Sequence, residues 1–98
     1  MAITGHTIHL TVAGAAEASA WYAKALDARE RSRITLPDGK LIHVELGFGD
    51  LTVMLADEFP EMTSFGPRHL DGTYGAIYLH LDDVDRGWDR AVRAGATV

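Results

Sequence analysis

The feature that most constrains this 98-residue chain is a change of hydrophobic period that occurs twice along it. From Thr7 to Val12, apolar and polar residues alternate, which is typical of a strand with one face on a core. From Ala15 to Leu26, the apolar residues fall at helical spacing in an alanine-rich stretch, and Asp27, which tolerates the left-handed conformation, could end this helix. The same order returns between Ala76 and Ala94. The pattern therefore predicts a strand-plus-helix unit that is repeated within the chain.

The residues between the two units predict three further strands. Arg29 to Leu36 is a plausible edge strand of low apolar content, and Pro37-Asp38-Gly39 after it is a turn sequence. Residues 41–48 and 51–56 both alternate, and Gly49-Asp50 between them predicts a hairpin. The apolar positions of the first of these two strands are Ile42, Val44, Leu46 and Phe48.

The chain should therefore form one α+β domain in three stretches. Residues 1–58 are a βαβββ module, residues 59–75 a linker, and residues 76–98 a strand and a helix that begin a second module. Asp83 or Asp85 can cap this last helix, and Gly95 suits its end. We expect a curved mixed sheet of about five strands with both helices on its convex face.

Composition excludes several classes of function. Nine Lys and Arg against fourteen Asp and Glu give a net charge of −5, and the basic residues form no stripe, which argues against a nucleic-acid partner. The chain has no cysteine, which excludes thiolate metal sites and disulfides. It shows no signal-peptide pattern and no apolar run near the ~18 residues of a membrane span. We expect a cytoplasmic protein without a membrane partner.

Alternation assigns the strand residues to two faces. The face that should pack on the helices contains Ile8, Leu10, Val12, Val44, Leu46, Val53, Leu55, Ile77 and Leu79. The opposite face collects hydrogen-bonding side chains among small ones, which suits a polar small molecule. We predict that the ligand-binding cleft contains His9, His43, Glu45, Met54, Tyr78 and His80.

Each of these residues also has a plainer interpretation. His9 could be a hydrogen-bonded strand histidine. His43 and Glu45 lie two apart on one face, so they could be a structural ion pair, a pair that orients a ligand, or metal ligands. Tyr78 and His80 could equally be structural. Imidazole and carboxylate groups can also move protons near neutral pH, so the pattern alone does not decide between these roles.

Three segments resemble one known family. The first helix carries Ala20-Trp21-Tyr22-Ala23-Lys24-Ala25-Leu26, followed by Asp27 where the family has a glycine. The hairpin contains His43-Val44-Glu45-Leu46-Gly47-Phe48-Gly49-Asp50 and then Val53-Met54-Leu55-Ala56-Asp57-Glu58. The end runs from Val84-Asp85 to Ala94-Gly95-Ala96-Thr97-Val98. In this order the segments resemble the vicinal-oxygen-chelate superfamily (glyoxalase, bleomycin resistance and dioxygenase proteins), and in particular its PhnB-like branch.

The resemblance implies two βαβββ modules whose sheets curl around a cleft. Here the second module has only its strand and helix, so we expect either a truncated chain or a sheet edge completed by another subunit. Trp21 and Trp88 lie on apolar helix stripes and are predicted core anchors. The apolar stripe of the last helix needs an apolar surface to pack on, and it contains Val84, Trp88 and Val92. Because a single strand is a poor surface for it, we expect a homodimer in which another subunit provides one.

The resemblance also locates the family's metal ligands. They would fall at Thr7, Met54 and Ala76, none of which is a metal ligand of the expected kind, so we predict no metal and no cofactor. The preferred function is small-molecule binding of the drug-binding or resistance type, by enclosure. One alternative is a metal-dependent lyase, isomerase or dioxygenase with displaced ligands (His9, His43, Glu45 and His80). Another is a non-catalytic fragment or assembly module.

Overall fold

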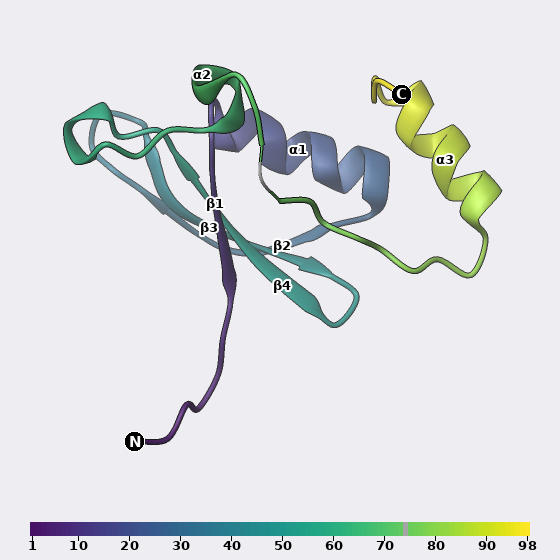
Figure 1. The fold of residues 1–98 in the computed structure, drawn as a ribbon, viewed down its shortest axis with the longest axis horizontal. Helices are drawn as coiled ribbons and strands as arrows, with labels where there is room; N and C mark the ends of the chain where they lie inside the picture. Colours follow the sequence, from purple (N-terminus) through teal and green to yellow (C-terminus); the bar gives the residue numbers. More distant parts are fainter. Residues whose placement is uncertain (74) are drawn as a thin grey trace.

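The computed structural model describes residues 1–73 and 75–98 and has a four-stranded sheet with α1 packed on one face (Figure 1). The elements are β1 (Ile8–Val12), α1 (Ala15–Leu26), β2 (Arg29–Thr35), β3 (Leu41–Phe48), β4 (Leu51–Asp57), the 3-10 helix η1 (Pro60–Met62), α2 (Pro67–Leu70) and α3 (Val84–Arg93). The predicted α+β class and the βαβββ order of the first module are confirmed.

The sheet is mixed because α1 carries the chain from one edge of the sheet to the other. Its strand order is β1-β4-β3-β2. β1 pairs with β4 in parallel, whereas β2 with β3 and β3 with β4 are antiparallel. The tight turn at Gly49, whose φ is 59°, forms the predicted hairpin between β3 and β4. The turn at Pro37 to Gly39 also forms, with Gly39 at a φ of 90°.

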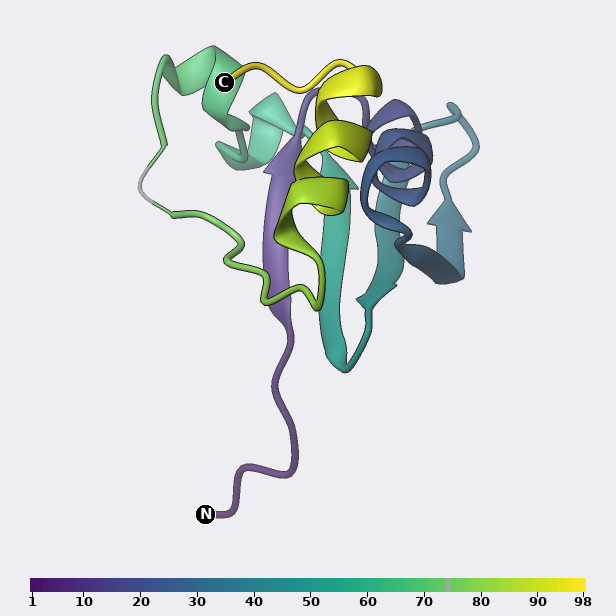
Figure 2. The ribbon, with the colours of Figure 1, turned by 90° about the vertical axis from the view of Figure 1, so that its right-hand side faces the viewer.

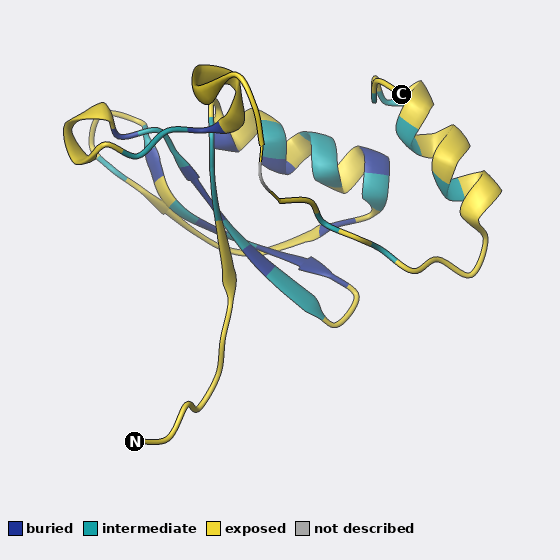
Figure 3. Ribbon diagram, in the orientation of Figure 1, coloured by how far each residue is buried: buried dark blue, intermediate teal, exposed yellow. Residues whose placement is uncertain are grey.

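The core lies between the sheet and α1, where Figure 3 shows most of the buried positions. Val44, Leu46, Val53 and Leu55 are the largest fully buried side chains, as the alternation predicts. The prediction for Ile42 is wrong: it is exposed, and Leu41 is buried in its place. The reason is a register shift between β2 and β3, which moves the alternation by one residue at the start of β3.

Asp57, at the end of β4, joins the sheet to the start of α1. Gly14 precedes the helix without a side-chain cap. Asp57 supplies the missing acceptor from a distant strand: its Oδ1 accepts the Ala15 N–H at 2.7 Å. Its Oδ2 accepts the Leu41 N–H at 2.7 Å, so one carboxylate fixes both the helix and the first residue of β3. At the other end, Asp27 adopts a φ of 57° and terminates α1 as predicted.

The two outer edges of the sheet differ. β2 is exposed along its whole length, and its pairing with β3 shifts register twice, between Glu30 and Ser32 and between Ile34 and Thr35. β1 pairs with β4 through five residues without a shift, and in the described part of the chain its other side has no ladder. The sheet therefore has one irregular edge and one regular edge.

The predicted strand over Ala76–Leu81 does not form, so among the described residues the sheet has four strands rather than about five. Ile77 and Leu79 nevertheless pack against the core, as predicted. Alternation reports which side chains are buried, but it does not report whether a neighbouring backbone accepts the ladder hydrogen bonds. The segment is therefore extended, and two of its side chains contact the core, but its backbone pairs with no strand among the described residues.

α3 lies beside α1 (Figure 2). The two helices are joined by polar contacts, and not through the apolar stripe of α3. Trp21 donates its indole N–H to the Ala94 carbonyl at 2.7 Å, and Arg90 donates to the Lys24 carbonyl at 2.9 Å. Asp83 caps the helix as predicted by accepting the Arg86 N–H. The prediction of Trp88 as a core anchor is wrong, because 55% of it is exposed.

Candidate functional site

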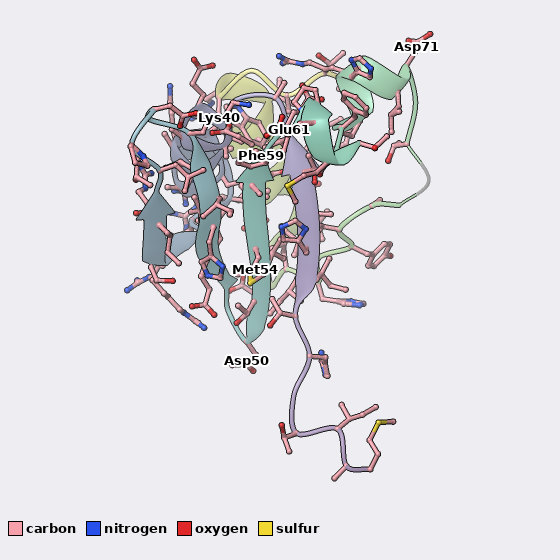
Figure 4. All side chains as sticks on the ribbon, turned by 90° about the vertical axis from the view of Figure 1, so that its left-hand side faces the viewer. Lys40, Asp50, Met54, Phe59, Glu61 and Asp71 are labelled. Atoms are coloured by element: carbon pink, nitrogen blue, oxygen red, sulfur yellow. The ribbon has the colours of Figure 1, made fainter. Side chains whose placement is uncertain are left out.

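The predicted ligand face is the side of the sheet opposite α1 (Figure 4). One row of residues crosses all four strands there, because the register places His9 beside Met54, Met54 beside Glu45, and Glu45 beside Ser32. Met54 lies in the middle of this row, on β4. We call this surface the open face. Its row combines an imidazole, a thioether, a carboxylate and a hydroxyl.

His43 and Glu45 lie on the open face and are half-buried, but they do not form the ion pair that was one interpretation of their spacing. Within the described chain, Glu45 Oε2 instead accepts a hydrogen bond from Ser32 Oγ at 3.3 Å. Cross-strand neighbours are closer than residues two apart on one strand, so the register decides the partner. His43 is opposite Ile34, which offers it no polar group.

Arg31 is a member of the open face that the sequence reasoning missed. The register shift between Glu30 and Ser32 turns both Arg31 and Ser32 toward this face. Arg31 donates to the Thr52 hydroxyl at 3.0 Å and, at 3.5 Å, to the Gly49 carbonyl. The sequence did contain a signal for this contact, because the charged strand β2 pairs with β3, which contains a glycine.

Gly47 is the glycine that makes room for this arginine. A Cβ at this position would lie 2.6 Å from Arg31 Nη2 and 2.8 Å from its Cζ, closer than real Cβ contacts. Gly47 itself is buried and pairs with Thr52 across the hairpin. The guanidinium therefore lies directly against the backbone of β3.

The structure does not bring Tyr78 and His80 into the row. Both side chains are exposed on the extended segment before α3, with their ring centroids 5.2 Å apart in an edge-on arrangement. Because Ile77 and Leu79 turn toward the core, the alternate residues turn away from it. The six predicted residues therefore divide into four on the open face and two on this segment.

The residues do not fit a metal centre of the family's kind. Thr7, Met54 and Ala76 provide no imidazole or carboxylate. The displaced set is also separated, since His80 is not in the row with His9 and Glu45. Over residues 1–73 and 75–98, no three His, Cys, Asp or Glu side chains converge as metal ligands would.

The segment after β4 packs against the last residues of β1, at one end of the open face. Thr11 and Ser64 share a hydrogen bond of 3.1 Å, and Glu58 accepts the Gly66 N–H. A Cβ at Gly66 would lie 2.9 Å from the Thr11 carbonyl oxygen, so backbone packs directly on backbone here. His69, on α2, stacks on Phe65 with ring centroids 4.0 Å apart.

Two surface depressions lie away from the predicted residues. One is lined by Ala13, Gly14, Asp38, Gly39, Lys40, Asp57, Glu58 and Pro60. The other, between α1 and α3, is lined by Lys24, Asp83, Asp85, Arg86, Asp89, Arg90, Arg93 and Ala94. Neither contains any of the six predicted site residues.

None of the helices in the described ranges is long and apolar enough to cross a membrane.

Solved structures share this fold. A gene product of Arabidopsis thaliana superposes with a TM-score of 0.73 at 18% identity, over 99% of this chain and 75% of that one. The protein UcmS2 gives 0.72 at 21% identity, over 99% and 78% of the two chains. TioX from a Micromonospora species gives 0.61 at 18% identity, over 96% and 74%. These likenesses concern the fold alone.

Curated relatives are closer in sequence but carry no assigned activity. An uncharacterized protein of Mycobacterium bovis is 48% identical over 93 residues, which are 92% of this chain and 61% of that protein. An uncharacterized protein of Mycobacterium tuberculosis is also 48% identical, over 55% of its length. The chain thus spans little more than half of these relatives. The family described as glyoxalase/bleomycin resistance protein/dioxygenase superfamily matches residues 4–98, and the chain belongs to that superfamily.

Proposed function

We propose that the chain binds a small polar molecule on the open face and works by enclosing it, as a drug-binding or resistance-type member of its superfamily, in the PhnB-like branch. The observation that carries the proposal is the row of His9, Met54, Glu45 and Ser32 across all four strands. α1 and α3 both lie on the other side of the sheet, so neither covers this row (Figures 1 and 4).

The chemistry of the row suits a ligand that is partly apolar. Ligand sites combine apolar contact with a few polar groups that fix orientation. Met54 offers a flexible and polarisable contact at the centre, and His9 and Glu45 offer hydrogen bonds on either side of it. Binding is favoured over metal-dependent catalysis because the candidate ligands do not converge on one point.

Enclosure requires a second surface over the open face, and we propose that a second copy provides it. The apolar stripe of α3 does not cover the open face of its own chain but is free to cover that of the second copy, because Val84, Trp88 and Val92 remain 64%, 55% and 41% exposed. Burying a large apolar side chain contributes ~1.5–3 kcal/mol. Light scattering at micromolar concentration should give about twice the 10.7 kDa chain mass, and a mass of one chain would reject the homodimer.

Amide NMR spectra of the protein, recorded with a library of small polar aromatic compounds, test the binding function. Hits should shift the amide signals of Met54 and Glu45, and Met54→Arg should abolish binding because it fills the centre of the row with a long cation. Met62→Arg is the matched control, since Met62 is 70% exposed on η1. Thermal unfolding would verify that both variants are folded. Hits that bind equally to wild type and Met54→Arg would refute the proposal.

A further inference from the structure

The guanidinium of Arg31 is positioned on the open face by three separate features of the chain. The register shift in β2 turns Arg31 to this face, Gly47 leaves room for its guanidinium, and Thr52 and Gly49 accept its hydrogen bonds. An arginine on a strand ordinarily extends into solvent. Here it is held against the backbone, and the two hydrogen bonds offset the side-chain entropy that this costs, so the guanidinium is oriented before any ligand binds.

The groups that hold Arg31 are neutral, which distinguishes it from Arg33 and Arg90. Arg33, on the same strand, pairs with Glu30 at 2.7 Å, and Arg90 lies 3.9 Å from Asp27. Among the described residues, no carboxylate lies within ion-pair distance of Arg31. The hydroxyl and the carbonyl satisfy two of its N–H groups and leave the others without a partner in the described chain.

From this arrangement we propose that the open face is specific for molecules carrying an oxyanion, a carboxylate or a phosphate-type group, and that Arg31 binds that group. The inference rests on the proposed function and deepens it. A planar guanidinium with unused N–H groups matches two oxygens of such an anion, and these bonds are stronger than those between neutral groups. Arg31 and Gly47 would then be specificity-determining residues.

The register also locates the anion relative to the rest of the ligand. Arg31 contacts Thr52, which lies two residues from Met54 on β4 and on the same face. Residues two apart on a strand are separated by about 6.5–7 Å. The anionic group should therefore lie near the β3–β4 turn, with the remainder of the molecule extending over Met54 toward His9. That span corresponds to a substituted aromatic or a compound of similar length.

Three phenyl compounds test the inference: benzoate, phenylphosphonate and the neutral benzamide, which matches benzoate in shape. Each is titrated into the protein at constant ionic strength and followed by amide NMR shifts. Wild type should bind either or both anions at least about tenfold more tightly than benzamide, with shifts at Gly47 and Thr52. Arg31→Met should remove that preference, a loss of about tenfold to a hundredfold. Arg31→Lys should restore it in part, because an ammonium lacks the planar pair of donors.

Arg33→Met is the matched control, since it removes the same charge from the same strand but from the ion pair with Glu30. It should keep the preference. Gly47→Ala keeps the charge and displaces the guanidinium, so it should behave like Arg31→Met, provided thermal unfolding shows a folded protein. Equal affinity of wild type for benzoate, phenylphosphonate and benzamide would overturn the inference. An equal loss of the preference for anions in Arg31→Met and Arg33→Met would also overturn the inference, because it would indicate a general effect of charge.

The two proposals can fail separately. Suppose that neutral compounds bind the open face, that Met54→Arg abolishes this binding, and that anions bind no more tightly than neutral compounds. The binding function then stands and the role of Arg31 is rejected. If no probe and no library compound shifts the amides of the open face, both proposals are rejected. Preference for benzoate over phenylphosphonate, or the reverse, identifies the kind of oxyanion and supports the inference in either case.

Discussion

Removing the carboxylate of Asp57 should be among the most destabilising single changes in this chain. It accepts one N–H from the start of α1 and one from the start of β3, both at 2.7 Å. The residues that donate them, Ala15 and Leu41, are 0% and 2% exposed, so water cannot readily replace the acceptor. Hydrogen bonds to a charged group contribute about 1.5–3 kcal/mol each. Asp57→Ala should therefore lower the free energy of unfolding by about 3–5 kcal/mol.

Asp57→Asn separates the two bonds. An amide keeps one acceptor oxygen but presents N–H donors where the second oxygen was, so one backbone N–H loses its partner. We expect a loss of about 1.5–3 kcal/mol, between wild type and Asp57→Ala. Urea unfolding followed by far-UV circular dichroism measures both, and the transition midpoint should fall with little change in its slope. For a domain of this size, each kcal/mol corresponds to roughly 4–8 °C in Tm.

Asp38→Ala is the control for this measurement. Asp38 also accepts a backbone N–H, from Lys40 at 2.9 Å, but in an exposed turn where water can replace it. We expect a loss of no more than about 1 kcal/mol. If Asp57→Ala costs no more than Asp38→Ala, the carboxylate does not join helix and sheet in the way described, and the reasoning is wrong.

Three further predictions use other contacts of the structure. Gly66→Ala should lower the free energy of unfolding by about 1–3 kcal/mol in urea titrations, because its Cβ would meet the backbone of β1, whereas Gly72→Ala, which meets nothing within 4 Å, should not. The hydrogen bond from Arg33 holds the pKa of Glu30 below its ordinary value, so its contribution to stability is present above the ordinary pKa and lost as pH falls through the lowered pKa; Glu30→Gln should remove this part of the acid dependence of Tm. Trp88→Ser should reduce the mass seen by light scattering toward one chain and give a Tm that no longer depends on protein concentration, and an unchanged mass would show that α3 is not the contact.

The sequence was most informative where burial and local chemistry agree. Alternation located β3 and β4 and the buried side of each, and it located Ile77 and Leu79 on the core although no strand forms there. Local chemistry located the end of α1 at Asp27 and the cap of α3 at Asp83, because both depend on residues adjacent in sequence.

What could not be predicted depends on register, which is a relation between segments. A shift in β2 turned Arg31 to the open face, and another placed Leu41 rather than Ile42 in the core. The residues of a bulge need not differ in kind from those of a regular strand, so its position cannot be read from alternation alone. The prediction for Trp88 was wrong for a related reason. Periodicity shows that the helix is amphipathic, but it does not show whether another surface packs against the apolar stripe.

The unequal edges of the sheet set a limit on how this protein can assemble. An incoming strand needs a straight row of unsatisfied N–H and C=O groups, and the bulges and charged side chains of β2 interrupt that row. The edge of β1 is regular, and another strand could add to it before Thr11, where the backbone at Gly66 already packs. Two copies that met edge to edge at β1 would leave only their β2 edges exposed. Association through the sheet would then be self-limiting, closing at a symmetric pair instead of propagating into a fibre.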